Sequence, residues 1–104
     1  MPTIDYDGHS FEVDDEGFLA DFNNWNAQWA DYASRNEDIE LTDEHWSVIK
    51  VLQEYYHENG IPPMVRLISR LTGFKLKYIY ELFPSGPGRG ACKIAGLGKP
   101  HGCI

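Results

Sequence analysis

The sequence has 104 residues, of which 42% are apolar and 13% are aromatic, enough for one globular domain with a hydrophobic core. No run of about 18 apolar residues could span a bilayer. The opening MPTIDYDGHS has no apolar signal segment, so the expected location is the cytoplasm.

Charge is divided unevenly along the chain, although the total is only −7. Residues 1–59 hold 15 acidic residues against Arg35 and Lys50, a net charge of −13. Residues 60–104 hold Glu81 against seven basic residues, a net charge of +6. This division is compatible with acids that only solvate a helical body, and also with a basic half that meets an anionic surface or substrate.

A β-hairpin is predicted over residues 3–13. The segment TIDYDGHSFEV alternates polar and apolar residues around Asp7-Gly8, a dipeptide that suits a two-residue turn. That turn would place Ile4 opposite Phe11, so the apolar face of the hairpin needs a helical layer to cover it.

Four helices are predicted after the hairpin, because apolar side chains recur at helical spacing. Asn23-Asn24 precede the first helix, and Thr42 is the expected N-cap of the second. Gly73 separates the third from the fourth, and Pro84 ends the fourth. The predicted helices cover about residues 24–34, 42–59, 63–71 and 75–83. The side chains predicted to face the core are Trp25, Trp29, Tyr32, Trp46, Ile49, Leu52, Tyr56, Met64, Leu67, Ile68, Leu71, Leu76, Ile79, Tyr80 and Phe83.

The predicted fold class is therefore α+β and mostly α. Residues 1–83 form a globular body, which consists of the N-terminal β-hairpin and a helical bundle with a helix-turn-helix-like segment. Residues 84–104 contain six glycines and three prolines and form a flexible C-terminal arm. Such a segment should be mobile unless a partner or the surface of the body orders it. Fully extended, the 20 residues after Phe83 would reach on the order of 65 Å.

Two cysteines lie in this arm. In a cytosolic chain they are expected to be redox-active rather than a structural staple. Cys92 and Cys103 could approach each other if the arm folds back, and an extended arm would present Cys103 to another protein. An exposed thiol suits a persulfide or mixed disulfide, which a second thiolate can resolve. Nearby Lys93, Lys99 and His101 would favour the thiolate form of Cys103, while the terminal carboxylate of Ile104 would oppose it, so both directions of the pKa shift stay open.

Other site chemistries fit the sequence less well. A zinc site needs four ligands, and the arm offers only Cys92, His101 and Cys103. No Ser/His/Asp or paired-carboxylate arrangement can be proposed, so an autonomous enzyme is not expected. The helix-turn-helix-like segment could bind DNA, but the acidic body would repel a polyanion and few side chains could read base edges. The basic residues of that segment are Arg66, Arg70, Lys75 and Lys77.

The arm sequence LFPSGPGRGACKIAGLGKPHGC resembles the C-terminal signature of the DsrC/TusE family, also described as the gamma subunit of dissimilatory sulfite reductase. The stretches GHSFEVDDEGFL, LTDEHWSVIKVLQEYYHENGIPPMVRLISRLTGFKL and YIYELFPSGPG extend this resemblance over nearly the whole chain. The resemblance implies a sulfur-trafficking protein that carries sulfur on the penultimate cysteine, here Cys103. Cys92 matches the second arm cysteine of DsrC proper, which TusE-type relatives typically lack.

The resemblance also implies partners and a reaction. The arm would enter a channel of siroheme-containing sulfite reductase, whose alpha and beta subunits are the expected partners. Siroheme and iron-sulfur clusters are expected in that partner, while this chain binds no cofactor or metal itself. Cys103 would accept sulfur derived from sulfite, Cys92 would close a trisulfide with it, and a membrane-bound thiol/disulfide reductase complex would release sulfide. The arm residues expected to contact anions or the partner are Arg89, Lys93, Lys99 and His101.

Alternatives within sulfur chemistry stay open. The family also includes carriers in oxidative sulfur metabolism and in tRNA thiolation, which exchange persulfide sulfur with other sulfurtransferases. Some sulfur-oxidising relatives carry an insertion before the last helix, and GFKLKYIYELF has none, which favours sulfite reduction. Gly98 and His101 stand where proline and threonine are common in the family, which bears on arm stiffness and thiol pKa rather than on the role.

Overall fold

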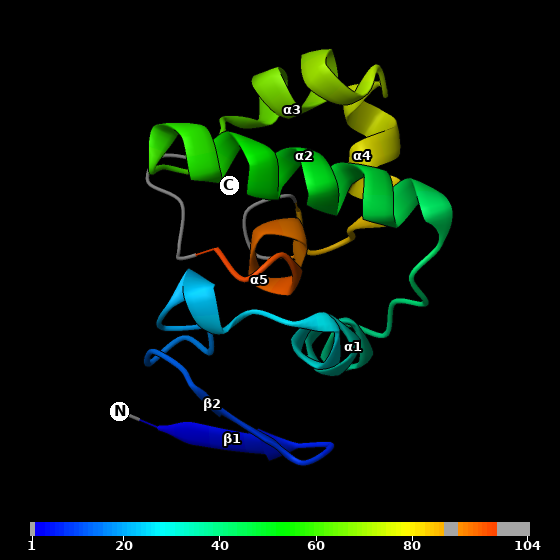
Figure 1. The fold of residues 1–104 in the computed structure, drawn as a ribbon. Coiled ribbons are helices and arrows are strands. Elements are labelled where there is room, and N and C mark those ends of the chain that lie inside the picture. The colour runs from blue at the N-terminus through cyan, green and yellow to red at the C-terminus, as the bar shows by residue number, and fades with distance from the viewer. Residues whose placement is uncertain (1, 87–89, 98–104) are drawn as a thin grey trace.

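The computed structural model describes residues 2–86 and 90–97 and confirms a mostly helical α+β fold. Figure 1 shows α5 lying between α1 and α2, with α3 and α4 on the far side of α2 and the hairpin beyond α1. Within the described residues no helix combines the length and the apolar character that crossing a membrane requires. The elements in order are β1 (Thr3–Tyr6), β2 (His9–Glu12), the 3-10 helix η1 (Phe22–Asn24), α1 (Ala27–Asn36), α2 (Asp43–Asn59), α3 (Val65–Thr72), α4 (Leu76–Leu82) and α5 (Cys92–Ile94).

The hairpin has the predicted register, with Ile4 opposite Phe11. Asp7 and Gly8 both adopt positive φ angles, 51° and 80°, as a two-residue hairpin turn requires. Phe11 is buried and meets the ring of Trp29 edge-on, with 5.3 Å between ring centroids. Helix α1 therefore supplies the helical cover that the apolar face of the hairpin needs.

A polar contact at the surface also ties the hairpin to α1. The hydroxyl of Tyr6 donates a hydrogen bond to the carboxylate of Asp31, which also accepts from Arg35 Nε at 3.1 Å. The bond from Tyr6 lowers the pKa of Asp31, because it stabilises the carboxylate, and the contacts with Arg35 lower it further. The same bond raises the pKa of the Tyr6 hydroxyl.

The helix caps agree with the sequence prediction for α2 but not for α1. Thr42 caps α2 by accepting from the backbone N–H of His45, whose Nδ1 accepts in turn from the N–H of Thr42 at 3.1 Å. Asn23-Asn24, predicted to precede α1 directly, lie in η1 instead. The cap of α1 is Asn26, because the extended backbone of Trp25 separates η1 from α1.

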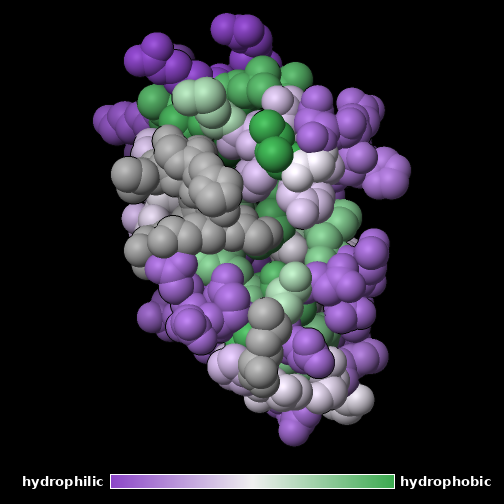
Figure 2. Space-filling model, turned by 90° about the vertical axis from the view of Figure 1, so that its left-hand side faces the viewer, coloured by the Kyte–Doolittle hydropathy of each residue, from purple (hydrophilic) through white to green (hydrophobic). Residues whose placement is uncertain are grey.

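The core confirms part of each predicted apolar stripe. Ile49 and Leu52 of α2, Ile68 of α3 and Ile79 of α4 are fully or almost fully buried. Because α3 has eight residues and α4 has seven, each helix presents only a short face to its neighbours, and the ends of the stripes extend past that face. Hydrophobic surface is visible at the α3 end of the molecule in Figure 2. The side chains predicted to be buried but found exposed are Trp46 (36%), Met64 (66%), Leu71 (50%), Leu76 (38%) and Tyr80 (40%).

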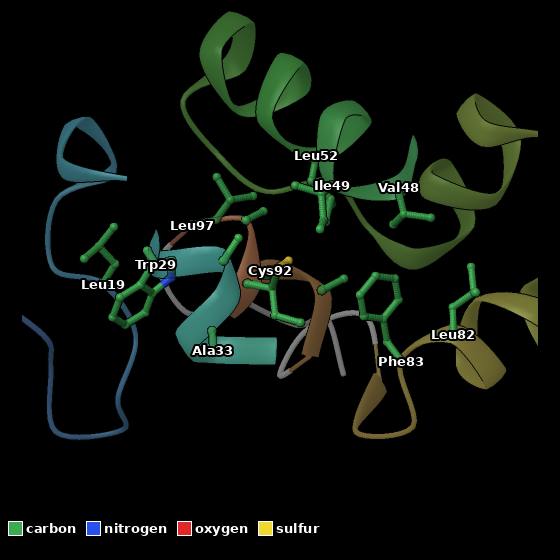
Figure 3. Close-up of a cluster of buried hydrophobic side chains, with 14 of the residues drawn as sticks. Leu19, Trp29, Ala33, Val48, Ile49, Leu52, Leu82, Phe83, Cys92 and Leu97 are labelled. Atoms are coloured by element: carbon green, nitrogen blue, oxygen red, sulfur yellow. The ribbon is translucent and has the colours of Figure 1, made fainter. Parts of the chain in front are cut away.

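The largest difference from the sequence prediction concerns residues 90–97, which were placed in an arm separate from the body. In the structure Cys92, Ile94 and Leu97 are 0% exposed and belong to the same core cluster as α1 and α2. The segment forms no core of its own, but its few aliphatic side chains fill the space between two helices of the body (Figure 3). The body therefore orders residues 90–97, and the predicted mobility of the other residues of the arm stays a prediction.

Candidate functional site

Cys92 is the one predicted thiol that lies within the described residues. It begins α5, a single helical turn, and its side chain is buried among residues of α1 and α2 such as Ala33 and Ile49 (Figure 3). The sulfur therefore lies at the centre of the fold, next to the point where the chain continues toward Cys103. Cys103 itself lies outside the described residues.

A tight turn follows α5 and reverses the chain. The N–H of Gly96 donates to the carbonyl of Lys93 at 3.1 Å, and the N–H of Leu97 donates to the carbonyl of Cys92 at 3.0 Å. Gly96 has φ of 82°, so the turn has the bonds and the left-handed residue of a Schellman motif. The chain that leaves at Leu97 therefore starts beside the backbone of Cys92.

The backbone carbonyls of residues 93–95 are each bound by a side chain of the body. A one-turn helix leaves most of its carbonyls without helical partners. The carbonyl of Lys93 also accepts from the N–H of Gly96, whereas those of Ile94 and Ala95 need donors from elsewhere. The donors come from three places in the fold: Trp25 precedes α1, Trp29 lies in α1, and Gln53 lies in α2. We call this set of three side chains the carbonyl socket. Its bonds are Trp29 Nε1 to Lys93 O at 2.8 Å, Trp25 Nε1 to Ile94 O at 3.0 Å, and Gln53 Nε2 to Ala95 O at 3.0 Å.

Close packing against Gly96 adds to the carbonyl socket. A Cβ atom at this position would lie 2.5 Å from Cδ1 of Trp25 and 2.9 Å from its Cβ. Only glycine fits against the indole there, and only glycine adopts the left-handed backbone without strain. Gly73 also has a positive φ, but a Cβ built on it would meet nothing within 4 Å.

The predicted cationic residues of the arm are only partly placed. Lys93 is half-buried, and its ammonium group lies 5.0 Å from the centroid of the Phe18 ring, a cation–π distance. Lys93 also lines a pocket with Gly17 and Glu37 beside α1. The other arm residues predicted to contact anions or the partner, Arg89, Lys99 and His101, lie outside the described residues.

The basic residues of the predicted helix-turn-helix segment are all exposed on or beside α3 and α4. They could meet an anionic partner, and DNA binding stays a prediction. Across residues 2–86 and 90–97, no three His, Cys, Asp or Glu side chains gather in a way that could hold a metal ion. The exposed basic residues of the helix-turn-helix segment are Arg66, Arg70, Lys75 and Lys77.

Sequence reasoning found Cys92 but missed the residues that hold it. Trp25 and Trp29 were interpreted only as core side chains, and Gln53 was not singled out. One signal was available, because a buried tryptophan usually finds an acceptor for its indole N–H. The sequence alone could not show that the acceptors of the two indole groups are the carbonyls of Lys93 and Ile94, more than 60 positions away.

Comparison with known proteins places the chain in a family. The family model described as DsrC like protein matches residues 5–104. The dissimilatory-type sulfite reductase subunit gamma of Nitratidesulfovibrio vulgaris is 54% identical over 105 residues, with 100% of both chains covered. The sulfurtransferase TusE of Shigella dysenteriae is 36% identical over 106 residues, covering 95% of this chain and 97% of the relative.

A solved structure gives the same result in three dimensions. A chain in the crystal structure of dissimilatory sulfite reductase I (DsrI) superposes with a TM-score of 0.93 at 53% identity, covering 99% of this chain and 100% of that chain. The match therefore includes the hairpin, the helices and the segment that contains Cys92. Sequence and fold agree that this chain belongs to the DsrC like protein family.

Proposed function

We propose that this protein is a sulfur carrier and a co-substrate of dissimilatory sulfite reductase. Its similarity to a sulfite reductase gamma subunit and to a sulfurtransferase supports sulfur handling in general. The observation that carries the proposal is the position of Cys92, a thiol side chain fixed at the point where the chain turns toward Cys103. Cys103 accepts sulfur and Cys92 resolves it.

The turn after α5 makes this pair of roles geometrically reasonable. The N–H of Leu97 is hydrogen-bonded to the carbonyl of Cys92, and the six residues that follow Leu97, up to Cys103, can span at most about 20 Å. Cys103 can therefore move away from the body to collect sulfur and still return to Cys92. A cysteine without such an anchor nearby would have to search a much larger volume.

The chemistry balances with two thiols and an external electron donor. Sulfite, two thiols, two electrons and four protons give a trisulfide that bridges Cys92 and Cys103, together with three water molecules. Four more electrons and four protons convert the trisulfide into sulfide and regenerate both thiols. Sulfite reductase supplies the first two electrons, and a membrane-bound thiol/disulfide reductase complex supplies the last four.

Charge supports the choice of partner. Arg89, Lys99 and His101 would bring cationic groups to the sulfite and siroheme carboxylates of the reductase alpha and beta subunits. The proposed location is the cytoplasm. This chain contributes thiols and positive charge, whereas siroheme and iron-sulfur clusters belong to the partner.

A second candidate within sulfur chemistry is a persulfide relay, which the similarity to a sulfurtransferase favours. In that reaction Cys103 would exchange sulfur with another thiol, and Cys92 would not be required. The two candidates therefore predict different effects of replacing Cys92: sulfur transfer would fail in the trisulfide reaction and continue in the persulfide relay.

Intact mass spectrometry after reaction with sulfite reductase, sulfite and an electron donor tests the proposal. The proteins compared are the wild type, Cys92→Ala and Cys103→Ala. We expect the wild type to gain one sulfur atom that bridges both cysteines, and Cys103→Ala to gain none. Equal modification of Cys103→Ala and the wild type would contradict the assignment. A Cys92→Ala variant that carries and passes on persulfide as well as the wild type would favour the relay.

A further inference from the structure

We propose that Trp25, Trp29 and Gln53, the carbonyl socket, are positioning residues of the sulfur relay. They fix Cys92 and residues 93–97 on the body, so that the chain leading to Cys103 starts from an anchored Leu97. This inference rests on the proposed function. It adds the contacts that limit how far Cys103, the sulfur-carrying residue, can lie from Cys92.

The short helix α5 cannot hold its own position. It has three residues, and a single isolated turn is unstable because the first hydrogen bond fixes several dihedral angles at once. The carbonyls of residues 93–95 are bound by side chains from α1, from the residues before α1 and from α2. The position of Cys92 therefore depends on contacts with three separate parts of the body.

The carbonyl socket changes how far Cys103 can reach. With residues 90–97 docked, the arm begins beyond Leu97 and Cys103 can lie at most about 20 Å from it. If the whole segment after Phe83 left the body, the same thiol could lie on the order of 65 Å away. Docking thus shortens the tether to about a third of its released length.

A shorter tether raises the effective concentration of one thiol near the other. Closing a flexible loop costs entropy, and the cost is smaller when one end is already fixed and fewer residues must be ordered. The docked segment thus favours the bond between Cys92 and Cys103 over reaction of either thiol with outside reagents.

Gln53→Met is the sharpest variant, because methionine has a similar length but cannot donate a hydrogen bond to Ala95. Gln28→Met is the matched control, since Gln28 is also half-buried, lies in α1 and has a side chain that makes no hydrogen bond to the described residues. Gly96→Ala is a second test variant, because its Cβ would collide with Trp25. All variants are compared under conditions in which circular dichroism shows them to be fully folded.

The first measurement is the equilibrium between the intramolecular disulfide of Cys92 and Cys103 and a glutathione buffer. Loss of one neutral hydrogen bond should weaken the docking of residues 90–97 about three- to tenfold in Gln53→Met, and the equilibrium constant should fall by up to that factor, because release of the segment costs the disulfide form more than the reduced form. Gly96→Ala should lower it further, and Gln28→Met should leave it within twofold of the wild type. An unchanged or raised constant in Gln53→Met and Gly96→Ala would overturn the inference.

The second measurement separates the carbonyl socket from the proposed function. In a Cys103→Ser background, the rate at which a thiol reagent alkylates Cys92 reports release of residues 90–97 from the body. Gln53→Met should raise this rate about three- to tenfold over Gln28→Met. If the rates are equal, the socket does not hold Cys92, whatever the protein does with sulfur. If the rate rises but the wild type gains no sulfur from sulfite reductase, the positioning stands and the proposed function fails.

Discussion

Two regions of the molecule bury their side chains in the opposite way from what composition suggests. Residues 90–97 are mostly small and include two glycines, yet nearly all of them are buried. Helices α3 and α4 are rich in large apolar side chains, yet Met64, Leu71 and Tyr80 in and beside them are exposed. The difference shows that burial depends on which surface a segment meets as much as on its own hydropathy.

The backbone explains why the less hydrophobic segment is the more deeply buried. A buried segment must satisfy its polar groups, and the carbonyls of residues 93–95 find donors in the carbonyl socket. The turn at Gly96 uses the remaining local donors. Helices α3 and α4 lie at the surface, where water can reach the backbone groups at their ends that have no helical partner.

Truncating one aliphatic side chain in each region should give the largest contrast. Ile94→Ala removes a fully buried side chain and should lower the free energy of unfolding by about 2–5 kcal/mol. Leu71→Ala removes a side chain that is 50% exposed and should cost well under half as much, about 1 kcal/mol or less. Urea denaturation followed by tryptophan fluorescence measures both.

Equal costs for the two truncations would contradict this contrast. A small loss for Ile94→Ala would mean that residues 90–97 contribute little to the core, and a large loss for Leu71→Ala would mean that the outer face of α3 is covered. The denaturant dependence of the free energy should be the same in both variants if each unfolds as one unit.

Two glycines give the next largest contrast. Gly96 and Gly73 have nearly the same positive φ, 82° and 78°, so alanine should cost about 1–2 kcal/mol at either position for backbone strain. Gly96→Ala should cost about 1–3 kcal/mol more than Gly73→Ala, because only its Cβ would strike Trp25. Thermal unfolding of the two variants measures the difference directly, and equal melting temperatures would show that the indole moves aside freely.

His45 also binds a distant backbone carbonyl with its side chain, as the residues of the carbonyl socket do. Because the N–H of Thr42 donates to Nδ1, the ring proton is on Nε2, which donates to the carbonyl of Leu82 at the end of α4, at 2.8 Å. His45→Ala removes both bonds and should cost about 1–2 kcal/mol. His45→Gln can restore the N-cap contact but not the bond to Leu82, so its cost should be intermediate. Chemical denaturation of the two variants checks the order.

Local signals were sufficient to predict most of the fold. The turn at Asp7-Gly8 set the hairpin register, Thr42 set the start of α2, and glycines and prolines marked the helix ends. Each of these features depends on residues a few positions apart. The exposed ends of the stripes in α3 and α4 were missed because helical spacing shows which side chains share a face, but not how much of that face a neighbour covers.

The sequence was sufficient to single out the cysteine of the candidate site, but not the residues that hold it. Cys92 stood out as a thiol in a glycine-rich segment, and the family resemblance that pointed to its role is confirmed. Its burial and its hydrogen-bonded neighbours depend on contacts between Trp25, Gln53 and residues 93–95, which are far apart in the sequence. No local pattern encodes such contacts, because a side-chain donor can reach any carbonyl that the fold brings near it.

The smallest expected effect is at the surface contact between the hairpin and α1, in contrast to the buried bonds of the carbonyl socket. The bond from Tyr6 and the contacts with Arg35 lower the pKa of Asp31 from the usual value of 3.8. A lowered pKa in the folded state means that the contribution of Asp31 to stability is complete above the unfolded-state pKa and is lost as the pH falls through the folded-state pKa. The difference in melting temperature between the wild type and Asp31→Asn should therefore be small and constant near neutral pH, and should shrink below about pH 4.

The control for this pH dependence is Asp15→Asn, because Asp15 is exposed and makes no hydrogen bond to the described residues. Its melting temperature should follow that of the wild type across the same range. Tyr6→Phe should reproduce most of the effect of Asp31→Asn, because the hydroxyl of Tyr6 is the largest cause of the lowered pKa. A difference that grows as the pH falls would require Asp31 to be stabilised in its protonated form, which is the opposite of what the hydrogen bond from Tyr6 does. Salt should weaken the part of the effect due to Arg35 and leave the part due to Tyr6, since only the exposed ion pair is screened.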